Sequence, residues 1–152
     1  MNTEEKLYTR FLKKYKLKYL VPSILTIFSI YFWITLINYD FLKIIGLIIN
    51  IVGLLVWWFA RLTLAENWDA GYGKPTIKQL VTRGIYSKIR HPLYLGINMT
   101  LAGLSILYSQ IWFAGISLVI IIYFFRRMYL EDSYLSEKLG EEYRDYKNKT
   151  WF

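Results

Sequence analysis

Long stretches without charge constrain this chain more than any other feature. Residues 19–39 contain no charged side chain, and residues 42–60 contain only Lys43, at one edge. Two further apolar runs, 93–108 and 111–125, are separated by an uncharged dipeptide. At 1.5 Å per residue these two would span roughly 22 to 25 Å, against a hydrocarbon core of about 30 Å. We therefore expect them to form a tight helical hairpin whose second arm continues past its apolar run. The pattern predicts an all-α integral membrane protein with four transmembrane helices.

The composition argues against a small soluble domain. Of 152 residues, 55% are hydrophobic and 19% are aromatic, which in water would leave large apolar patches exposed. The length predicts a single domain over 1–152. The chain has no cysteine, which excludes disulfides and thiol catalysis. The first run is too long for a signal-peptide core and lacks a small-residue cleavage site, so we expect it to remain as an anchor.

The basic residues predict the orientation in the membrane. Of 19 lysines and arginines, six precede the first run, six lie between residues 61 and 92, and six follow the fourth run. Only Lys43 is left for the opposite side. By the positive-inside rule, both termini and the central loop are cytoplasmic. The net charge of +8 does not indicate nucleic acid, because these residues flank the spans; contact with anionic lipid head groups fits better.

Two amphipathic segments flank the spans. Residues 3–18 carry apolar side chains every four residues with lysines between them, which is typical of a helix on the membrane surface. After Phe125, an apolar stripe at helical spacing predicts a C-terminal cytoplasmic helix; its members are Met128, Leu135, Leu139, Tyr143 and Tyr146. Asp132 falls within this stripe and Glu131 on its edge. These acids either have a partner inside the protein or are hydrated on an interfacial helix.

Small residues recur at matching intervals in the second and third runs: Gly46, Asn50 and Gly53, then Gly96, Thr100 and Gly103. Such stripes allow helices to approach closely in lipid, so packing alone explains them. A cofactor-binding surface is the less favoured alternative. The connection over 61–92 is long enough to indicate a functional or disordered loop.

The only histidine lies at the start of the third run. Pro92 disfavours a helical conformation at His91 and suits a first helical turn itself, which predicts that His91 caps a helix at the cytoplasmic end of the span. Free N–H groups there, with Arg90, favour an anion, while Glu131 and Asp132 favour a cation. The combination suits a zwitterionic amino-acid moiety, although a histidine before proline is usually structural. Metal ligation and serine or cysteine hydrolysis lack the required residue spacing.

The same residues resemble the superfamily of isoprenylcysteine carboxyl methyltransferases and phospholipid methyltransferases, which are integral-membrane enzymes. The resemblance covers residues 80–146 and rests on Leu80-Val81-x-x-Gly84-x-Tyr86-x-x-x-Arg90-His91-Pro92-x-Tyr94-x-Gly96, Glu131-Asp132-x-x-Leu135 and Gly140-x-x-Tyr143-x-x-Tyr146. It implies S-adenosylmethionine as the cofactor. The methionine end of the cofactor would contact Arg90, His91 and Tyr94. The amino group of the cofactor would contact Glu131 and Asp132. The loop from Val81 through Gly84 to Tyr86 would cover the adenosine. The chain departs from the family in having Ile85 for a proline and Asp132 for a glutamate.

The resemblance implies methyl transfer to a lipophilic acceptor, either isoprenoid or phospholipid-like, at the cytoplasmic membrane face. A carboxylate acceptor needs no base, whereas an amine must lose a proton, in which Glu131 or a tyrosine such as Tyr94 would assist. Prenylated cysteine, phosphatidylethanolamine, another isoprenoid and a small thiol all remain open as acceptors. We expect lateral entry through the bilayer, bordered by Trp57, Trp58 and Phe59.

Two other functions are compatible with the motif. NADPH-dependent sterol or fatty-chain reductases resemble the same core and carry Arg-His-Pro-x-Tyr-x-Gly, but they are typically much longer. A non-catalytic membrane scaffold that keeps the fold is the third possibility. The sequence does not predict an oligomeric state.

Overall fold

The structure, a computed structural model, describes residues 23–35, 40–64 and 80–151. The described part of the chain is helical, with one isolated parallel bridge between Ile89 and Trp151. The helices are Ser23–Thr35, α2 (Phe41–Leu64), η2 (Gly84–Ser87), α3 (Pro92–Tyr108), α4 (Ile111–Leu139) and α5 (Glu141–Lys149). The predicted surface helix over 3–18 and much of the predicted 61–92 loop lie outside the described residues.

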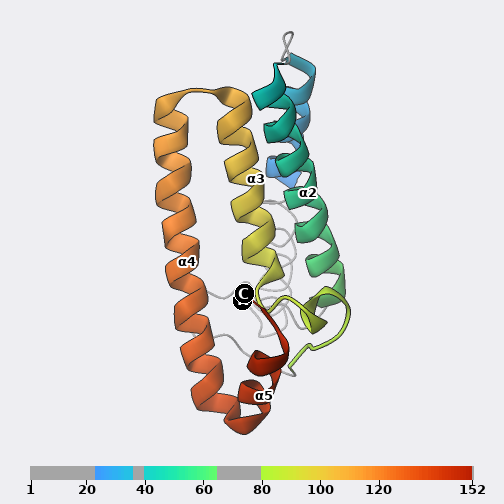
Figure 1. Cartoon of the computed structure of the whole chain (residues 1–152), viewed down its shortest axis with the longest axis vertical. Helices are drawn as coiled ribbons and strands as arrows, with labels where there is room; N and C mark the ends of the chain where they lie inside the picture. Colours follow the sequence, from blue (N-terminus) through green and yellow to red (C-terminus); the bar gives the residue numbers. More distant parts are fainter. Residues whose placement is uncertain (1–22, 36–39, 65–79, 152) are drawn as a thin grey trace, which may run out of the picture.

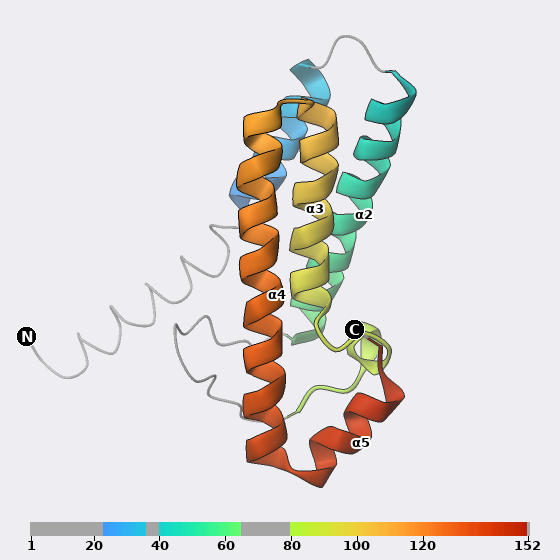
Figure 2. The ribbon, with the colours of Figure 1, turned by 60° about the vertical axis from the view of Figure 1, so that its left-hand side comes forward.

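The predicted hairpin is confirmed. Ser109 caps α3 in a left-handed conformation, with φ of 55°, and its N–H donates to the Ser105 carbonyl at 3.0 Å. Helix α4 begins two residues later and runs back along α3, well beyond the apolar run that ends at Phe125 (Figure 1). Helix α3 lies between α2 and α4 in both ribbon views (Figures 1 and 2). This arrangement brings the start of α3 and the second half of α4 to the same end of the bundle.

Close backbone contact joins α2 and α3. A Cβ atom on Gly53 would lie 2.5 Å from the Thr100 nitrogen, and one on Gly96 would lie 2.6 Å from the Trp57 nitrogen. These separations are shorter than any van der Waals contact, so the two helices can approach this closely only with glycine at both positions. The packing interpretation of the small-residue stripes is thereby confirmed.

Asn50 adds polar links to the same interface. Its side-chain nitrogen donates to the Thr100 carbonyl at 3.0 Å, and its side-chain oxygen accepts from the Trp33 indole at 3.2 Å. The Thr100 hydroxyl donates to the Gly96 carbonyl at 2.8 Å. Both polar ends of the buried Asn50 amide are thus bonded, and the helix Ser23–Thr35 is tied to α2.

The outer surface of the bundle is apolar. Along α4, the exposed side chains include Ile116, Val119, Ile122 and Phe125, which lie three residues apart. An exposed apolar face of this kind suits contact with lipid chains. Among the described residues, α2 and α4 are long and apolar enough to cross a membrane, whereas Ser23–Thr35 and α3 are shorter apolar helices.

Two predicted boundaries were wrong. Helix α2 continues to Leu64 instead of ending near residue 60, and Arg61 is buried in its last turn, where a cation stabilises the helix dipole. The helix predicted across 128–146 is broken at Gly140, which has φ of 56° and ψ of −125°. A side chain would be strained in this conformation, whereas glycine adopts it readily. Helix α5 therefore folds back toward the start of α3 (Figure 2).

Candidate functional site

The segment before α3 packs against the end of α2. Gly84 opens η2 with φ of 59°, and a Cβ atom there would lie 3.1 Å from the Thr63 side chain. Tyr86 is buried, while Val81 is half-buried ahead of the turn. The three residues predicted to cover an adenosine thus lie in one short segment at the site end of the bundle.

His91 occupies the predicted position at the start of α3. It is the residue before the first helical turn, Pro92 begins the helix, and the Leu95 N–H donates to the His91 carbonyl at 3.0 Å. The His91 side chain is buried. Proline at the first helical position and a non-helical residue before it explain why α3 begins here.

Asp132 accepts contacts from four side chains on two other segments. One oxygen lies 2.6 Å from His91 Nε2 and 2.5 Å from the Tyr143 hydroxyl. The other lies 3.2 Å from Arg90 Nη1 and 3.6 Å from Lys147 Nζ. The Asp132 side chain is only 17% exposed, so these donors replace water around the carboxylate. The predicted proximity of Asp132 to Arg90 and His91 is confirmed.

Glu131 makes a separate contact beside this cluster. The Tyr94 hydroxyl donates to Glu131 Oε2 at 2.8 Å. The Tyr94 ring also lies 5.9 Å from the His91 ring and 5.6 Å from the Phe124 ring, measured between centroids. The two neighbouring acids therefore have different partners. Asp132 contacts the basic residues. Glu131 accepts one hydrogen bond, from the Tyr94 phenol, and its second oxygen can still accept another.

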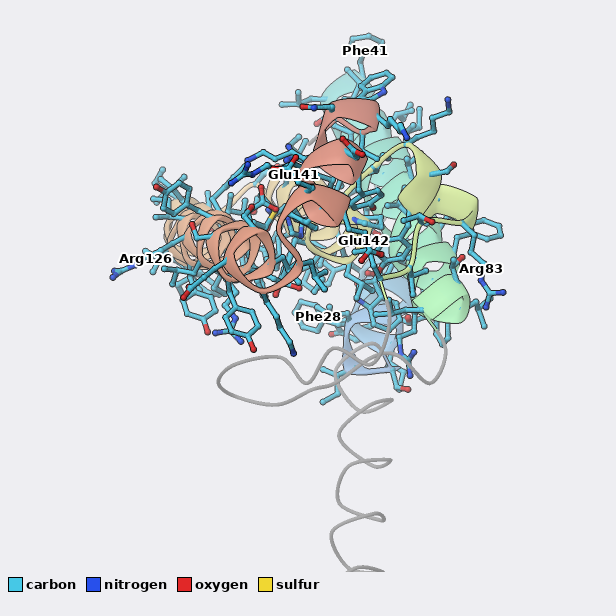
Figure 3. The ribbon with its side chains drawn as sticks, turned by 90° about the horizontal axis from the view of Figure 1, so that it is seen from below. Phe28, Phe41, Arg83, Arg126, Glu141 and Glu142 are labelled. Atoms are coloured by element: carbon cyan, nitrogen blue, oxygen red, sulfur yellow. The ribbon has the colours of Figure 1, made fainter. Side chains whose placement is uncertain are left out.

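Helix α5 contacts both the second half of α4 and the segment before α3. Tyr143 donates to Asp132, and the Tyr146 hydroxyl donates to the Tyr86 carbonyl at 2.7 Å. Burial raises the pKa of the Tyr143 phenol well above its usual range and raises the pKa of Tyr146 to about 12. Both phenols therefore stay protonated at neutral pH and donate. Figure 3, viewed from this end, shows α5 across the bundle, with Arg83 and Arg126 pointing outward.

Residues beyond α5 fix the backbone of the motif. The Trp151 N–H donates to the Lys88 carbonyl at 2.9 Å, and the Arg90 N–H donates to the Trp151 carbonyl at 3.3 Å. These bonds lie on either side of Ile89, and one of them is made by the backbone of Arg90, whose side chain contacts Asp132. Residue 151 is therefore part of the frame that positions Arg90.

Several residues around the site were not among the predicted ones. Burial raises the pKa of the Tyr86 phenol well above its usual range, and the Glu131 carboxylate raises it further, whereas the charge of Arg61, a side chain only 3% exposed, acts to lower it. Lys147 contacts Asp132. The sequence signal for Arg61 was a charge directly after an apolar run, which is equally typical of a membrane border. Lys147 follows the predicted stripe, but only the bend at Gly140 brings it to the site.

A substitution at this bend tests whether α5 holds the site together. We expect Gly140→Ala to lower the free energy of unfolding by about 1 to 3 kcal/mol, because alanine is strained at this φ and ψ. It should also speed hydrogen exchange in residues 84–91, which lose the Tyr146 contact. Asn148→Ala, on the exposed side of α5, should change neither quantity. Unchanged exchange in Gly140→Ala would show that α5 does not support the motif segment.

The fold and the site together define a class of protein: an all-helical integral membrane protein with a polar acid–base cluster at one end of its bundle. A sequence profile of the phospholipid methyltransferase family matches residues 41–142, which is about two thirds of the chain. The chain belongs to this family. In the described residues, no three His, Asp or Glu side chains are grouped so as to hold a metal ion.

Individual relatives are isoprenylcysteine methyltransferases. The protein-S-isoprenylcysteine O-methyltransferase of Tribolium castaneum is 30% identical over 122 residues, covering 78% of this chain and 43% of that protein. The Dictyostelium discoideum enzyme of the same name is 36% identical over 73 residues, covering 47% and 31%. The solved structure of the eukaryotic intramembrane Ras methyltransferase ICMT (isoprenylcysteine carboxyl methyltransferase) superposes with a TM-score of 0.65 at 27% identity, covering 91% of this chain and 50% of that chain. The chain spans less than half the length of these two curated relatives.

Proposed function

We propose that this protein transfers a methyl group from S-adenosylmethionine to a lipophilic acceptor, and that the acceptor is a prenylated cysteine carboxylate. The observation that carries the proposal is the convergence of Arg90, His91 and Tyr94 on Glu131 and Asp132. Membership of the phospholipid methyltransferase family supports the reaction class. The isoprenylcysteine methyltransferases among its relatives support the choice of acceptor.

The residues present fit the cofactor. Arg90 Nε is buried and has no hydrogen-bond partner in the described part of the chain, so one guanidinium donor is left for an anion such as the cofactor's carboxylate. The second oxygen of Glu131 is available to an ammonium group. Asp132 positions Arg90 and His91 for this contact, and we assign the segment from Val81 through Gly84 to Tyr86, which precedes them in the chain, to cover the adenosine.

The bound cofactor supplies an electrophilic methyl group on a sulfonium, whose departure needs no acid. The protein's task is then to align the acceptor and exclude water. A carboxylate acceptor attacks without a base, so Glu131 and Tyr94 serve to bind and orient. With an amine acceptor, Glu131 would instead take up the proton.

We place this chemistry at the cytoplasmic face of a four-span protein with cytoplasmic termini. The 18-to-1 distribution of lysine and arginine supports this orientation. Because the chain has no cysteine, a single introduced cysteine is the only site that a maleimide can label, so its labelling reveals the orientation in the membrane. We expect Ser109→Cys to react with an impermeant maleimide on intact cells, and Ser87→Cys to react only after permeabilisation. The opposite labelling pattern would overturn this topology.

The activity is tested with the purified protein in lipid nanodiscs. With labelled S-adenosylmethionine, we expect methyl transfer to N-acetyl-S-farnesyl-cysteine and release of the label as methanol on base hydrolysis, as for a methyl ester. We expect His91→Ala to weaken S-adenosylhomocysteine binding about 5- to 150-fold, or about 1 to 3 kcal/mol, because a charge-assisted contact is lost. Transfer to phosphatidylethanolamine alone would identify a phospholipid N-methyltransferase. Unchanged affinity in His91→Ala would remove that residue from the cofactor site.

A further inference from the structure

One buried polar side chain near the site has no role so far. The Asn98 side chain is 8% exposed, and neither its nitrogen nor its oxygen has a hydrogen-bond partner among the described residues. An unbonded amide is costly in an apolar, membrane-embedded position, and polar residues retained there usually serve a function. Asn50, which lies within the α2–α3 interface, shows the ordinary alternative, since both ends of its amide are bonded to neighbouring helices.

Asn98 lies on the face of α3 that carries the site. It follows Tyr94 by four residues, so the two side chains share one face, about 6 Å apart along the helix axis. Tyr94 contacts Glu131 and Phe124 of α4, which identifies this face as the one turned toward α4. Helices α3 and α4 lie side by side (Figure 2). Asn98 is therefore one helical turn further than Tyr94 from the end of the bundle that holds Arg90 and His91.

We propose that Asn98 binds the polar head of the methyl acceptor and selects an N-acylated amino-acid carboxylate. This inference rests on the proposed function. A carboxamide presents one donor and one acceptor side by side. An N-acyl prenylcysteine presents the complementary pair, because its carboxylate oxygen accepts and its amide N–H donates. The Asn98 nitrogen would hold the carboxylate oxygen that does not attack, and its oxygen would accept from the acceptor's amide.

Two ligands with the same tail test the pairing. N-acetyl-S-farnesyl-cysteine carries both groups, whereas farnesylthiopropionate keeps the carboxylate and the tail but lacks the acylamino group. Excess binding over empty nanodiscs measures each affinity, and the shared tail cancels partitioning into lipid. We expect the wild type to bind the first compound about 5- to 30-fold more tightly, the usual effect of one added hydrogen bond in a buried site. Equal binding of the two compounds by the wild type would overturn the proposal.

Variants assign that preference to Asn98. Asn98→Leu, of similar volume, should bind both compounds almost equally while keeping its affinity for S-adenosylhomocysteine. Asn98→Asp should bind both compounds more weakly than the wild type, because a second carboxylate repels theirs. Ser105→Ala is the matched control: Ser105 lies on the same face and its hydroxyl is bonded to the Leu101 carbonyl at 2.8 Å, so the preference should persist. A preference that survives in Asn98→Leu, or disappears in Ser105→Ala, would overturn the proposal.

The same measurements separate this inference from the proposed function. Methyl transfer by the wild type is scored independently of binding. An Asn98-dependent preference without transfer would refute the methyltransferase assignment and retain the binding role. Transfer with no dependence of binding on Asn98 would refute the binding role alone.

Discussion

Replacing Asp132 with alanine should abolish methyl transfer and lower the free energy of unfolding by about 2 to 4 kcal/mol. This carboxylate is the common partner of Arg90, His91, Tyr143 and Lys147. Removing it leaves basic groups close together without a counter-charge, which costs more than the loss of any single bond. The measurements are turnover of N-acetyl-S-farnesyl-cysteine and unfolding by steric trapping in bicelles.

Two further variants make this result interpretable. Asp132→Asn keeps the size and two bonding atoms but removes the charge, so it should recover part of the stability and little of the activity. Asp145→Ala, on the exposed side of α5, removes an acid without altering the cluster and should behave as the wild type. Full activity in Asp132→Ala would show that the cluster does not position the motif residues.

Gly103→Ala should give the largest loss of stability among single-methyl changes. A Cβ atom at this position would lie 2.5 Å from the Asn50 nitrogen and 2.6 Å from the Gly46 carbonyl oxygen. Because both neighbours are backbone, the added methyl must separate α2 from α3. We expect a loss of about 3 kcal/mol, the upper part of the range for overpacked cores.

Gly115→Ala is the control for this prediction. Gly115 is also inside an apolar helix, but a Cβ atom there meets nothing within 4 Å. Its replacement should change stability by less than about 1 kcal/mol, and in the favourable direction, because alanine favours a helix. Similar losses in Gly103→Ala and Gly115→Ala would show that the effect is not steric contact between α2 and α3.

Local chemistry explains which parts of the fold were predictable. Pro92 fixes the start of α3, and the uncharged dipeptide before Ile111 fixes the hairpin. The spacing of Gly96 and Gly103 identifies the face that packs on α2. Each of these features depends on a few neighbouring residues, so the sequence pattern was sufficient. The predicted proximity of the acidic pair to the Arg90–Tyr94 segment is confirmed as well, whereas the roles of these residues in binding and catalysis stay predictions.

The bend at Gly140 was not predictable from the same patterns. The apolar stripe continues from Leu139 to Tyr143 at helical spacing, so periodicity alone predicts an uninterrupted helix. In a straight helix, Tyr143 would lie about 16 Å beyond Asp132, yet their side chains are in contact. Which glycine takes a positive φ depends on the tertiary packing that forms when the chain folds back. The unbonded amide of Asn98 was not predictable for a similar reason, because the hydrogen-bond partners of an asparagine depend on the tertiary packing and not on its neighbours in sequence.

The long-range contacts of the site also determine the order in which the protein should lose activity and helical structure on heating. The contacts that assemble the site join residues 41, 42 and 60 positions apart in sequence, whereas the helices are held by local bonds and by the α2–α3 interface. Segments held by few long-range bonds open at lower free energy than packed helices. Turnover should therefore fall at a lower temperature than helicity does, and a preparation with full helical circular dichroism can already have an open site.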